Sequence, residues 1–165
     1  GGRADPVAEW SARRALVFET AHEYRYALDP RLTGQTHDRT RIDAAINALE
    51  PLLEEAWWDC RLLDSLAIAY LTTGEPQKAL DVLEHAEKLR DVPDHTSRTS
   101  EYNRACAYAQ LGDDEHAEAS LRNVIVLGWN DFGWLRQDPD FEGVRDRQWF
   151  SDLLAEHEEN GQTGA

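Results

Sequence analysis

The residues that could do chemistry are scattered along this chain instead of being grouped in a motif. The two cysteines, Cys60 and Cys106, form no CxxC pair and so lack the spacing of a zinc or redox motif. No phosphate-binding loop, dinucleotide-binding glycine pattern or GxSxG motif occurs, and the carboxylates fall on predicted polar helix faces, where they are normally solvated. The histidines fall on separate predicted elements without metal-ligand spacing: His22, His37, His85, His95, His116 and His157. The sequence therefore predicts no catalytic residue, no metal site and no cofactor.

The charge of the chain argues against a nucleic-acid partner. The formal net charge is −15 over 165 residues, which repels phosphate backbones. Near the C-terminus, arginines alternate with aspartates instead of forming a basic patch: Arg136, Asp138, Asp140, Arg145, Asp146 and Arg147. Such acidity is typical of a solvated surface, and it also fits a basic protein partner. The longest apolar runs, such as Leu66 to Leu71, are far too short to cross a bilayer, so we expect no membrane span.

The sequence leaves the cellular compartment open. The chain begins with Gly-Gly-Arg and contains no methionine, so we expect that a signal peptide, a longer protein or a tag has been removed, and export is one alternative. Cys60 and Cys106 are expected at different heights on neighbouring helices, which disfavours a disulfide between them. Unpaired cysteines favour a reducing compartment such as the cytoplasm.

Two stretches repeat the same order of small and aromatic residues. In Ala67 to Ala79 (AIAYLTTGEPQKA) and in Ala105 to Ala117 (ACAYAQLGDDEHA), alanine, tyrosine, glycine and alanine occur at identical offsets. The first alanine and the tyrosine would share one helix face, and the glycine would end that helix because it readily adopts a left-handed conformation. The last alanine would lie where a second helix crosses closely. Each stretch therefore predicts a helical hairpin.

The spacing of these hairpins resembles that of a known repeat. Ala45 to Ala79 is 34 residues, and Ala79 to Ala117 is 38, one more period with a short extension. The chain resembles the tetratricopeptide repeat, a 34-residue helix-turn-helix unit. Residues 60–93 and 98–131 match best. Their signature positions hold Leu63, Leu66, Ala67, Tyr70, Gly74, Ala79, Leu83 and Ala86 in the first unit, and Ala105, Tyr108, Gly112, Ala117 and Leu121 in the second.

The resemblance extends, with departures, over most of the chain as a single domain. In the second repeat Glu101 and Arg104 stand where large apolar residues are usual, and neither repeat ends in the customary proline. Residues 6–56 look like a degenerate first repeat with an inserted loop. Residues 132–158 look like capping helices similar to the ending often appended to bacterial repeats of this family, and 159–165 are a polar tail.

Local signals place elements within the degenerate first repeat. A helix is expected from Asp5-Pro6 until Pro30 ends it, and Leu32 to Asp38 reads as a loop. A second amphipathic helix is expected from about Thr40, with a break at Pro51.

The tryptophans have two readings. In the cap they are expected in the core, and an exposed aromatic binding platform is the alternative: Trp129, Trp134 and Trp149. Of the adjacent Trp57 and Trp58, at least one is expected to seal the turn between hairpins.

The resemblance implies an all-α fold, a right-handed α-solenoid whose first helices line a concave peptide-binding groove and whose end is closed by a helical cap. The groove positions carried over from the family are Arg61, Asp64, Ser65, Ile68 and Thr72 in one hairpin, and Thr99, Tyr102, Asn103, Cys106 and Gln110 in the next. An asparagine at the place of Asn103 commonly bonds a peptide backbone, since an amide offers a donor and an acceptor; a solvated helix residue is the alternative. Asp64 stands where a carboxylate clamp would need lysine, which disfavours binding of a chaperone tail.

The function that follows is a non-catalytic protein–protein interaction module that binds a peptide or protein segment in its groove. The alternative is a structural subunit of a larger assembly, which would use its convex surface, the 32–38 loop or its tryptophan-rich end.

Overall fold

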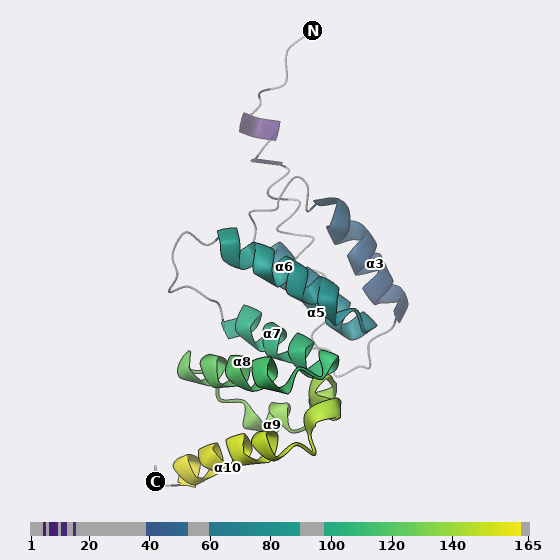
Figure 1. The fold of residues 1–165 in the computed structure, drawn as a ribbon. Helices are drawn as coiled ribbons and strands as arrows, with labels where there is room; N and C mark the ends of the chain where they lie inside the picture. Colours follow the sequence, from purple (N-terminus) through teal and green to yellow (C-terminus); the bar gives the residue numbers. More distant parts are fainter. Residues whose placement is uncertain are drawn as a thin grey trace. The chain divides into compact units, whose positions relative to one another are not determined.

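The chain is built from α-helices and short 3-10 helices, with no β-strand among the described residues. The computed structural model describes residues 5, 7–9, 11, 12, 15, 39–52, 60–89 and 98–162. Helices adjacent in the sequence pack together within two compact units, residues 1–95 and 96–165 (Figure 1). The predicted all-α class, with helices packed consecutively as in a tetratricopeptide-like array, is confirmed. The division into one domain with the repeat boundaries given above stays a prediction.

The described part of the first unit contains a helical hairpin and a helix that packs against it. The helix α3 (Arg39–Leu49) leads into the 3-10 helix η1 (Glu50–Leu52), and the hairpin consists of α5 (Cys60–Thr73) and α6 (Pro76–Leu89). Ile42 and Ala45 of α3 pack with Ala69 of α5 in a buried cluster. The predicted break at Pro51 is confirmed, because α3 ends before the proline and η1 contains it.

The second unit contains the other hairpin and the C-terminal helices. The hairpin consists of α7 (Arg98–Leu111) and α8 (Asp114–Val126), and it is followed by α9 (Phe132–Leu135), η2 (Pro139–Val144) and α10 (Gln148–Gln162). The C-terminal helices bury Leu135, Phe141, Val144, Phe150 and Leu153. The 3-10 helix η2 packs directly on α7.

The two hairpins turn in the same way. Gly74 and Gly112 follow the first helices with φ of 75° and 72°, in the left-handed region that glycine adopts without strain. The next amide then donates to the carbonyl of the signature tyrosine: Glu75 N to Tyr70 O at 2.8 Å, and Asp113 N to Tyr108 O at 3.0 Å. Tyr70 and Tyr108 therefore occupy equivalent places in their hairpins.

Alanines lie at the predicted crossings of the two helices in each hairpin. Ala67 and Ala79 in the first hairpin, and Ala105 and Ala117 in the second, have no solvent exposure. A methyl group at such a crossing lets two backbones approach, whereas a longer side chain would separate them. This complete burial agrees with the close crossing that the repeated motif predicts.

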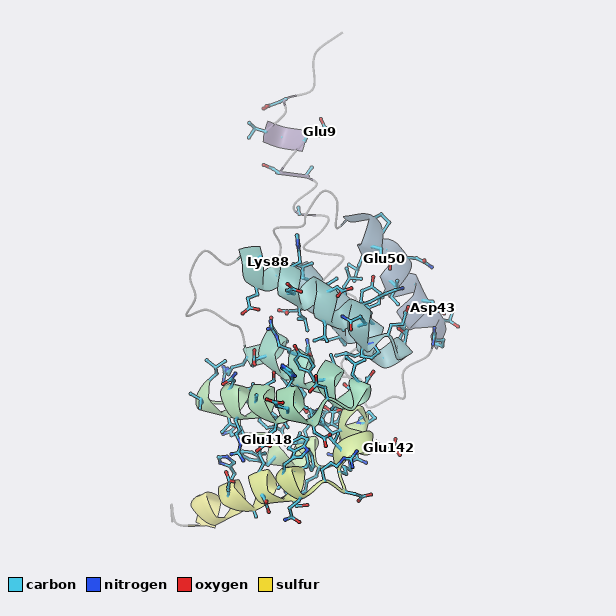
Figure 2. All side chains as sticks on the ribbon, in the orientation of Figure 1. Glu9, Asp43, Glu50, Lys88, Glu118 and Glu142 are labelled. Carbon is cyan, nitrogen blue, oxygen red and sulfur yellow. The ribbon has the colours of Figure 1, made fainter. Side chains whose placement is uncertain are left out.

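An acid and a base are bonded across the first turn of α6. Lys78 Nζ lies 2.7 Å from Glu75 Oε1 and 5.3 Å from the centre of the Tyr70 ring. The Tyr70 hydroxyl donates to Glu50 Oε1 at 2.5 Å; Glu50, labelled in Figure 2, begins η1. Burial is the main cause that raises the pKa of Tyr70, and the hydrogen bond to Glu50 is the second. The turn of the hairpin is thereby tied to the end of the preceding helix.

The second hairpin repeats this arrangement with a histidine in place of the lysine. His116 Nδ1 lies 2.9 Å from each carboxylate oxygen of Asp113, and its ring stacks on that of Tyr108 at 4.9 Å between centroids. The hydrogen bond to Asp113 raises the pKa of His116, and the same bond lowers the pKa of Asp113. The position that carries a lasting charge in one hairpin therefore carries a titrating group in the other.

Ion pairs align α10 with α8. Arg147, just before α10, lies 3.2 Å from Asp114 at the start of α8. Further along both helices, Arg122 Nη1 lies 2.9 Å from Glu156, while Arg122 Nη2 lies 2.8 Å from Glu118. The two helices therefore run in the same direction, start beside start. Exposed ion pairs of this kind add little stability.

Several predictions lie outside the described residues. They include the helix before Pro30 apart from a few positions, the 32–38 loop, and the two adjacent tryptophans Trp57 and Trp58. The connection before α7 from residue 90 to residue 97 also lies outside them.

Replacing Gly112 by alanine should destabilise the second unit by about 1–2 kcal/mol, because alanine adopts a left-handed backbone only with strain. No heavy atom lies within 4 Å of the position that a Cβ would take, so the loss should come from the backbone alone. The free energy of unfolding in urea measures it. Gly143→Ala is the matched control, since its Cβ would also meet open space and its φ is not left-handed. Equal losses in the two variants would contradict the assignment of the turn.

Replacing Ala117 by leucine should overpack the crossing of α7 and α8 and destabilise the protein by about 1–3 kcal/mol. Ala119→Leu on the exposed side of the same helix should change the free energy of unfolding by less than about 0.5 kcal/mol. Thermal and urea unfolding report both values. Unfolding curves that coincide for the two variants would refute the close crossing.

Candidate functional site

The predicted groove residues of α5 contribute in part to the packing of their own unit. Ser65 is 1% exposed, and Ile68 packs against the buried cluster shared with α3. Thr72 donates its hydroxyl to the carbonyl of Ile68 at 2.7 Å, and Asp64 is half-buried. The side chain of Arg61 lies outside the described residues.

On α7, three of the predicted groove residues meet the C-terminal part of the same unit. Tyr102, Cys106 and Gln110 follow one another along a helix face, and each contacts the segment Asp138–Phe141 at the start of η2. We call this segment the clasp. The other two predicted groove residues of α7 are Asn103, which is buried, and Thr99, which is half-buried.

Polar groups of α7 donate to both carboxylates of the clasp. The Tyr102 hydroxyl donates to Asp138 Oδ2 at 2.7 Å, and the Gln110 amide donates to Asp140 Oδ1 at 2.7 Å. The thiol of Cys106 also hydrogen-bonds to Asp140. Asp138 is 3% exposed, so these bonds form largely out of contact with water and replace those that water would supply.

The backbone of the clasp is fixed by Asp138. Its Oδ1 accepts from the amide of Asp140 at 3.0 Å, and its carbonyl accepts from the amide of Phe141 at 3.1 Å and from Arg145 Nη2 at 2.7 Å. Pro139 follows as the first residue of η2, where its fixed φ suits a helical start and its missing N–H leaves no donor unsatisfied. Asp138 thus caps η2 with its Oδ1 and accepts the hydrogen bond from Tyr102 of α7 with its Oδ2.

Burial changes the protonation chemistry of this cluster. Loss of hydration, with the neighbouring charge of Asp138 as second cause, raises the pKa of Asp140 to about 6. Burial also raises the pKa of the Cys106 thiol and of the Tyr102 hydroxyl. Both groups therefore stay neutral near pH 7, and the buried thiol is a poor nucleophile.

The packing of η2 on α7 accounts for the cluster of Cys106, Asp138 and Asp140 without a metal ion. Atoms of Cys106, Asp138 and Asp140 that could bind a cation lie within 4.8 Å of one another. However, Tyr102, Gln110, Cys106 and the Asp140 amide already donate to these carboxylates. We therefore assign the cluster to the contact between α7 and η2.

Aromatic rings surround the clasp. The ring of Tyr102 lies 5.0 Å from Trp129 and 5.8 Å from Phe141, centroid to centroid. Phe141 in turn stacks on Phe150 of α10 at 5.9 Å. The three tryptophans of this region are half-buried: Trp129, Trp134 and Trp149. Trp129 also contacts Phe132, and Trp149 contacts Phe150. None of the three tryptophans is fully buried, so their assignment to the core stays a prediction.

Asn103 differs from its neighbours on α7. Its side chain is on a residue only 6% exposed, and its Nδ2 has no acceptor among the described residues. A buried amide donor without a partner is unfavourable by about 1–3 kcal/mol, so such a group calls for an explanation. Of the predicted groove residues that the structure describes, it has the clearest unused hydrogen-bonding capacity.

Sequence reasoning missed the role of the clasp. In the sequence, Asp138 and Asp140 stand out only as members of the alternating charges near the C-terminus. The Asp-Pro-Asp order of residues 138–140 was a usable signal, because aspartate before proline is a common start for a 3-10 or α-helix.

The acidic charge is spread over the described elements. Asp43 on α3, Glu118 on α8 and Glu142 on η2, all labelled in Figure 2, belong to separate elements. Glu118 is paired with Arg122. No described helix is long and apolar enough to span a membrane.

Comparison with known proteins finds relatives over all or half of the chain. It is 29% identical over 159 residues to a chloroplastic protein from Arabidopsis thaliana, an alignment that covers 96% of this chain and 43% of the relative. It is 34% identical over 90 residues to DnaJ homolog subfamily C member 3 from Rattus norvegicus, and the human protein of that name is 36% identical over 84 residues. These alignments cover 54% and 51% of this chain, and 17% and 16% of the relatives. No protein-family model and no solved structure matches the chain.

These relatives agree with the fold. Both kinds of relative contain tetratricopeptide repeats, and the described hairpins have the helix-turn-helix form of that repeat. The chain is thus an all-α protein of tetratricopeptide-like hairpins, and its similarity is to proteins in which such repeats have a protein-interaction role. It spans less than half the length of each relative. The plant and mammalian relatives do not bear on the bacterial-type ending, which stays a prediction.

Replacing Tyr102 by phenylalanine should destabilise the second unit by about 1–3 kcal/mol, because a buried oxygen of Asp138 would lose its donor. The free energy of unfolding measures the loss. Tyr108→Phe is the control: it keeps the ring that stacks on His116 and should change stability by less than about 0.5 kcal/mol. A Tyr102→Phe protein as stable as the wild type would contradict the role of this hydrogen bond.

Proposed function

We propose that this chain is a non-catalytic protein–protein interaction module that binds an extended peptide or protein segment along the first helices of its hairpins. The observation that carries the proposal is the buried amide of Asn103, whose Nδ2 has no acceptor among the described residues. Because Nδ2 has almost no solvent contact in the free protein, the Asn103 side chain would turn toward a bound segment, whose backbone carbonyl would supply that acceptor. Binding would then satisfy a donor that is unsatisfied in the free protein.

The relatives and the charge support the same class of function. The similarity to the plant chloroplastic protein and to DnaJ homolog subfamily C member 3 connects the chain to proteins with tetratricopeptide repeats. The net charge of −15 favours approach of a basic segment, mainly by raising the rate of association. Asp64, on the face of α5 predicted to bind, would attract a lysine or arginine of such a segment.

The clasp narrows the set of binding residues on α7. Tyr102, Cys106 and Gln110 direct their polar atoms to the clasp. In the proposal Asn103 therefore makes the main polar contact on this helix while the clasp is in place.

A structural subunit of a larger assembly is the second candidate. Val126 is 85% exposed and Leu127 is 39% exposed at the end of α8, just before Trp129. Two exposed apolar side chains next to a half-buried tryptophan favour a protein contact at the tryptophan-rich end.

The proposal is tested in two steps. Proteins are first captured on the immobilised chain, and overlapping peptides that cover their sequences are then titrated against the chain by calorimetry. Asn103→Ala should lower the affinity for a bound peptide by about tenfold, which is equivalent to the loss of one buried hydrogen bond. The same variant should melt no lower than the wild type, because it removes an unsatisfied donor. Asn130→Ala, in the exposed connection after α8, is the matched control and should bind like the wild type.

The outcomes separate the two candidates. Binding that survives Asn103→Ala but is lost in Val126→Glu would overturn the proposed site and support the assembly role. Affinity unaffected by any of these substitutions would contradict both.

A further inference from the structure

We propose that the clasp is an acid-responsive element: its hold on α7 tightens in mildly acidic solution and loosens as the pH rises. This inference concerns the conformation of the second unit and goes beyond the proposed function. Its consequence for a partner, that Tyr102, Cys106 and Gln110 become available at higher pH, rests on that function.

The geometry places two carboxylates of the clasp against one helix. Asp138 is 3% exposed and Asp140 is half-buried, and both face α7 through hydrogen bonds to its side chains. The groups that donate to Asp140, the Gln110 amide and the Cys106 thiol, are neutral. Arg145 is directed to the carbonyl of Asp138. Two like charges therefore meet in a region of reduced hydration, where their repulsion is stronger than in water.

The titrating groups around Asp140 can be assigned from both sides of the contact. Cys106 and Tyr102 on α7 have raised pKa values, so neither loses its proton below about pH 8. Asp138 contributes a negative charge from within the clasp. Asp140, with a pKa raised to about 6, is thus the group of this cluster that gains or loses a proton near neutrality.

Linkage fixes the direction of the effect. The docked clasp binds a proton at Asp140 more tightly than the released clasp does, because release restores hydration and separates the carboxylates. Docking is therefore favoured as the pH falls below about 6 and loses this contribution as the pH rises through that value. With an ordinary aspartate pKa in the released state, the opening equilibrium should rise about tenfold between pH 5 and pH 8.

The pH response of the clasp must be measured locally, because His116 also contributes to the pH dependence of the second unit. Its pKa is also raised, so its bond to Asp113 stabilises the start of α8 below that pKa and weakens above it. Global unfolding of the second unit would mix this contribution with that of Asp140. Labelling of Cys106, which contacts Asp140 directly and is 1% exposed, reports on the clasp itself.

The test is the rate at which Cys106 reacts with 4,4′-dithiodipyridine in a Cys60→Ser background, with and without Asp140→Asn. Asparagine keeps an acceptor for Gln110 but has no charge. Dividing the wild-type rate by the Asp140→Asn rate at each pH cancels the intrinsic titration of the thiol. We expect this ratio to rise about tenfold from pH 5 to pH 8. Asp152→Asn, exposed on α10, is the matched control and should leave the wild-type rates unchanged.

A ratio that stays constant with pH would overturn the proposal, as would Asp140→Asn labelling as fast as the wild type at pH 8. If that variant fails to fold, amide hydrogen exchange in the wild type decides. The protection factors of the Asp140 and Phe141 amides, both bonded to Asp138, should fall as the pH rises, and constant factors would refute the clasp. Both measurements are made without a binding partner. A failure of peptide binding would therefore contradict the proposed function but not the pH response of the clasp.

Discussion

The close approach of two helices at buried alanines is the constraint on which the rest of this structure depends. Ala67 and Ala79 in one hairpin, and Ala105 and Ala117 in the other, bring the paired backbones together. A hairpin formed this way is too small to cover its own apolar face and must pack against something else. In the first unit that partner is α3, through Ile42 and neighbouring side chains. In the second it is η2, one of the C-terminal helices, which packs on α7.

The second unit meets this requirement with a mixture of apolar and polar contacts. Phe141 is completely buried, yet the residue before it is a carboxylate that faces a thiol and an amide. Apolar packing alone would hold η2 on α7 at any pH. The carboxylates add hydrogen bonds whose balance against dehydration depends on protonation. The same face of α7 is therefore a packing surface in this structure and a binding surface in the proposed function.

The parts of the fold that were predictable depend on short-range order. The offsets from alanine to tyrosine to glycine determine each hairpin, because helix faces and left-handed turns are set within a few residues. The break at Pro51 has the same local origin. The departure from the family at Glu101 also has a local explanation: the residue is 6% exposed and receives a hydrogen bond from Asn123 at 3.4 Å. A paired polar group thus replaces the usual apolar one.

The candidate site was harder to predict because its contacts join distant residues. Gln110 and Asp140 are thirty positions apart, and no periodicity in the sequence connects them. Family positions identified the face of α7 but not what covers it. The unsatisfied amide of Asn103 was likewise invisible, since the partners of a buried group are known only once the neighbouring helices are in place.

The ion pairs between α8 and α10 match a single register of α10 and a single orientation of its side chains. Arg147 meets Asp114, and about two turns later Arg122 meets Glu156. Sliding α10 by a single residue would rotate its side chains by about 100°, taking Phe150 and Leu153 out of the interior. Both bridges would break in the same step, so intermediate placements gain nothing from either. Burial of Phe150 and Leu153 therefore determines how α10 is seated, and the two exposed ion pairs form only in that seating and add a small contribution to it.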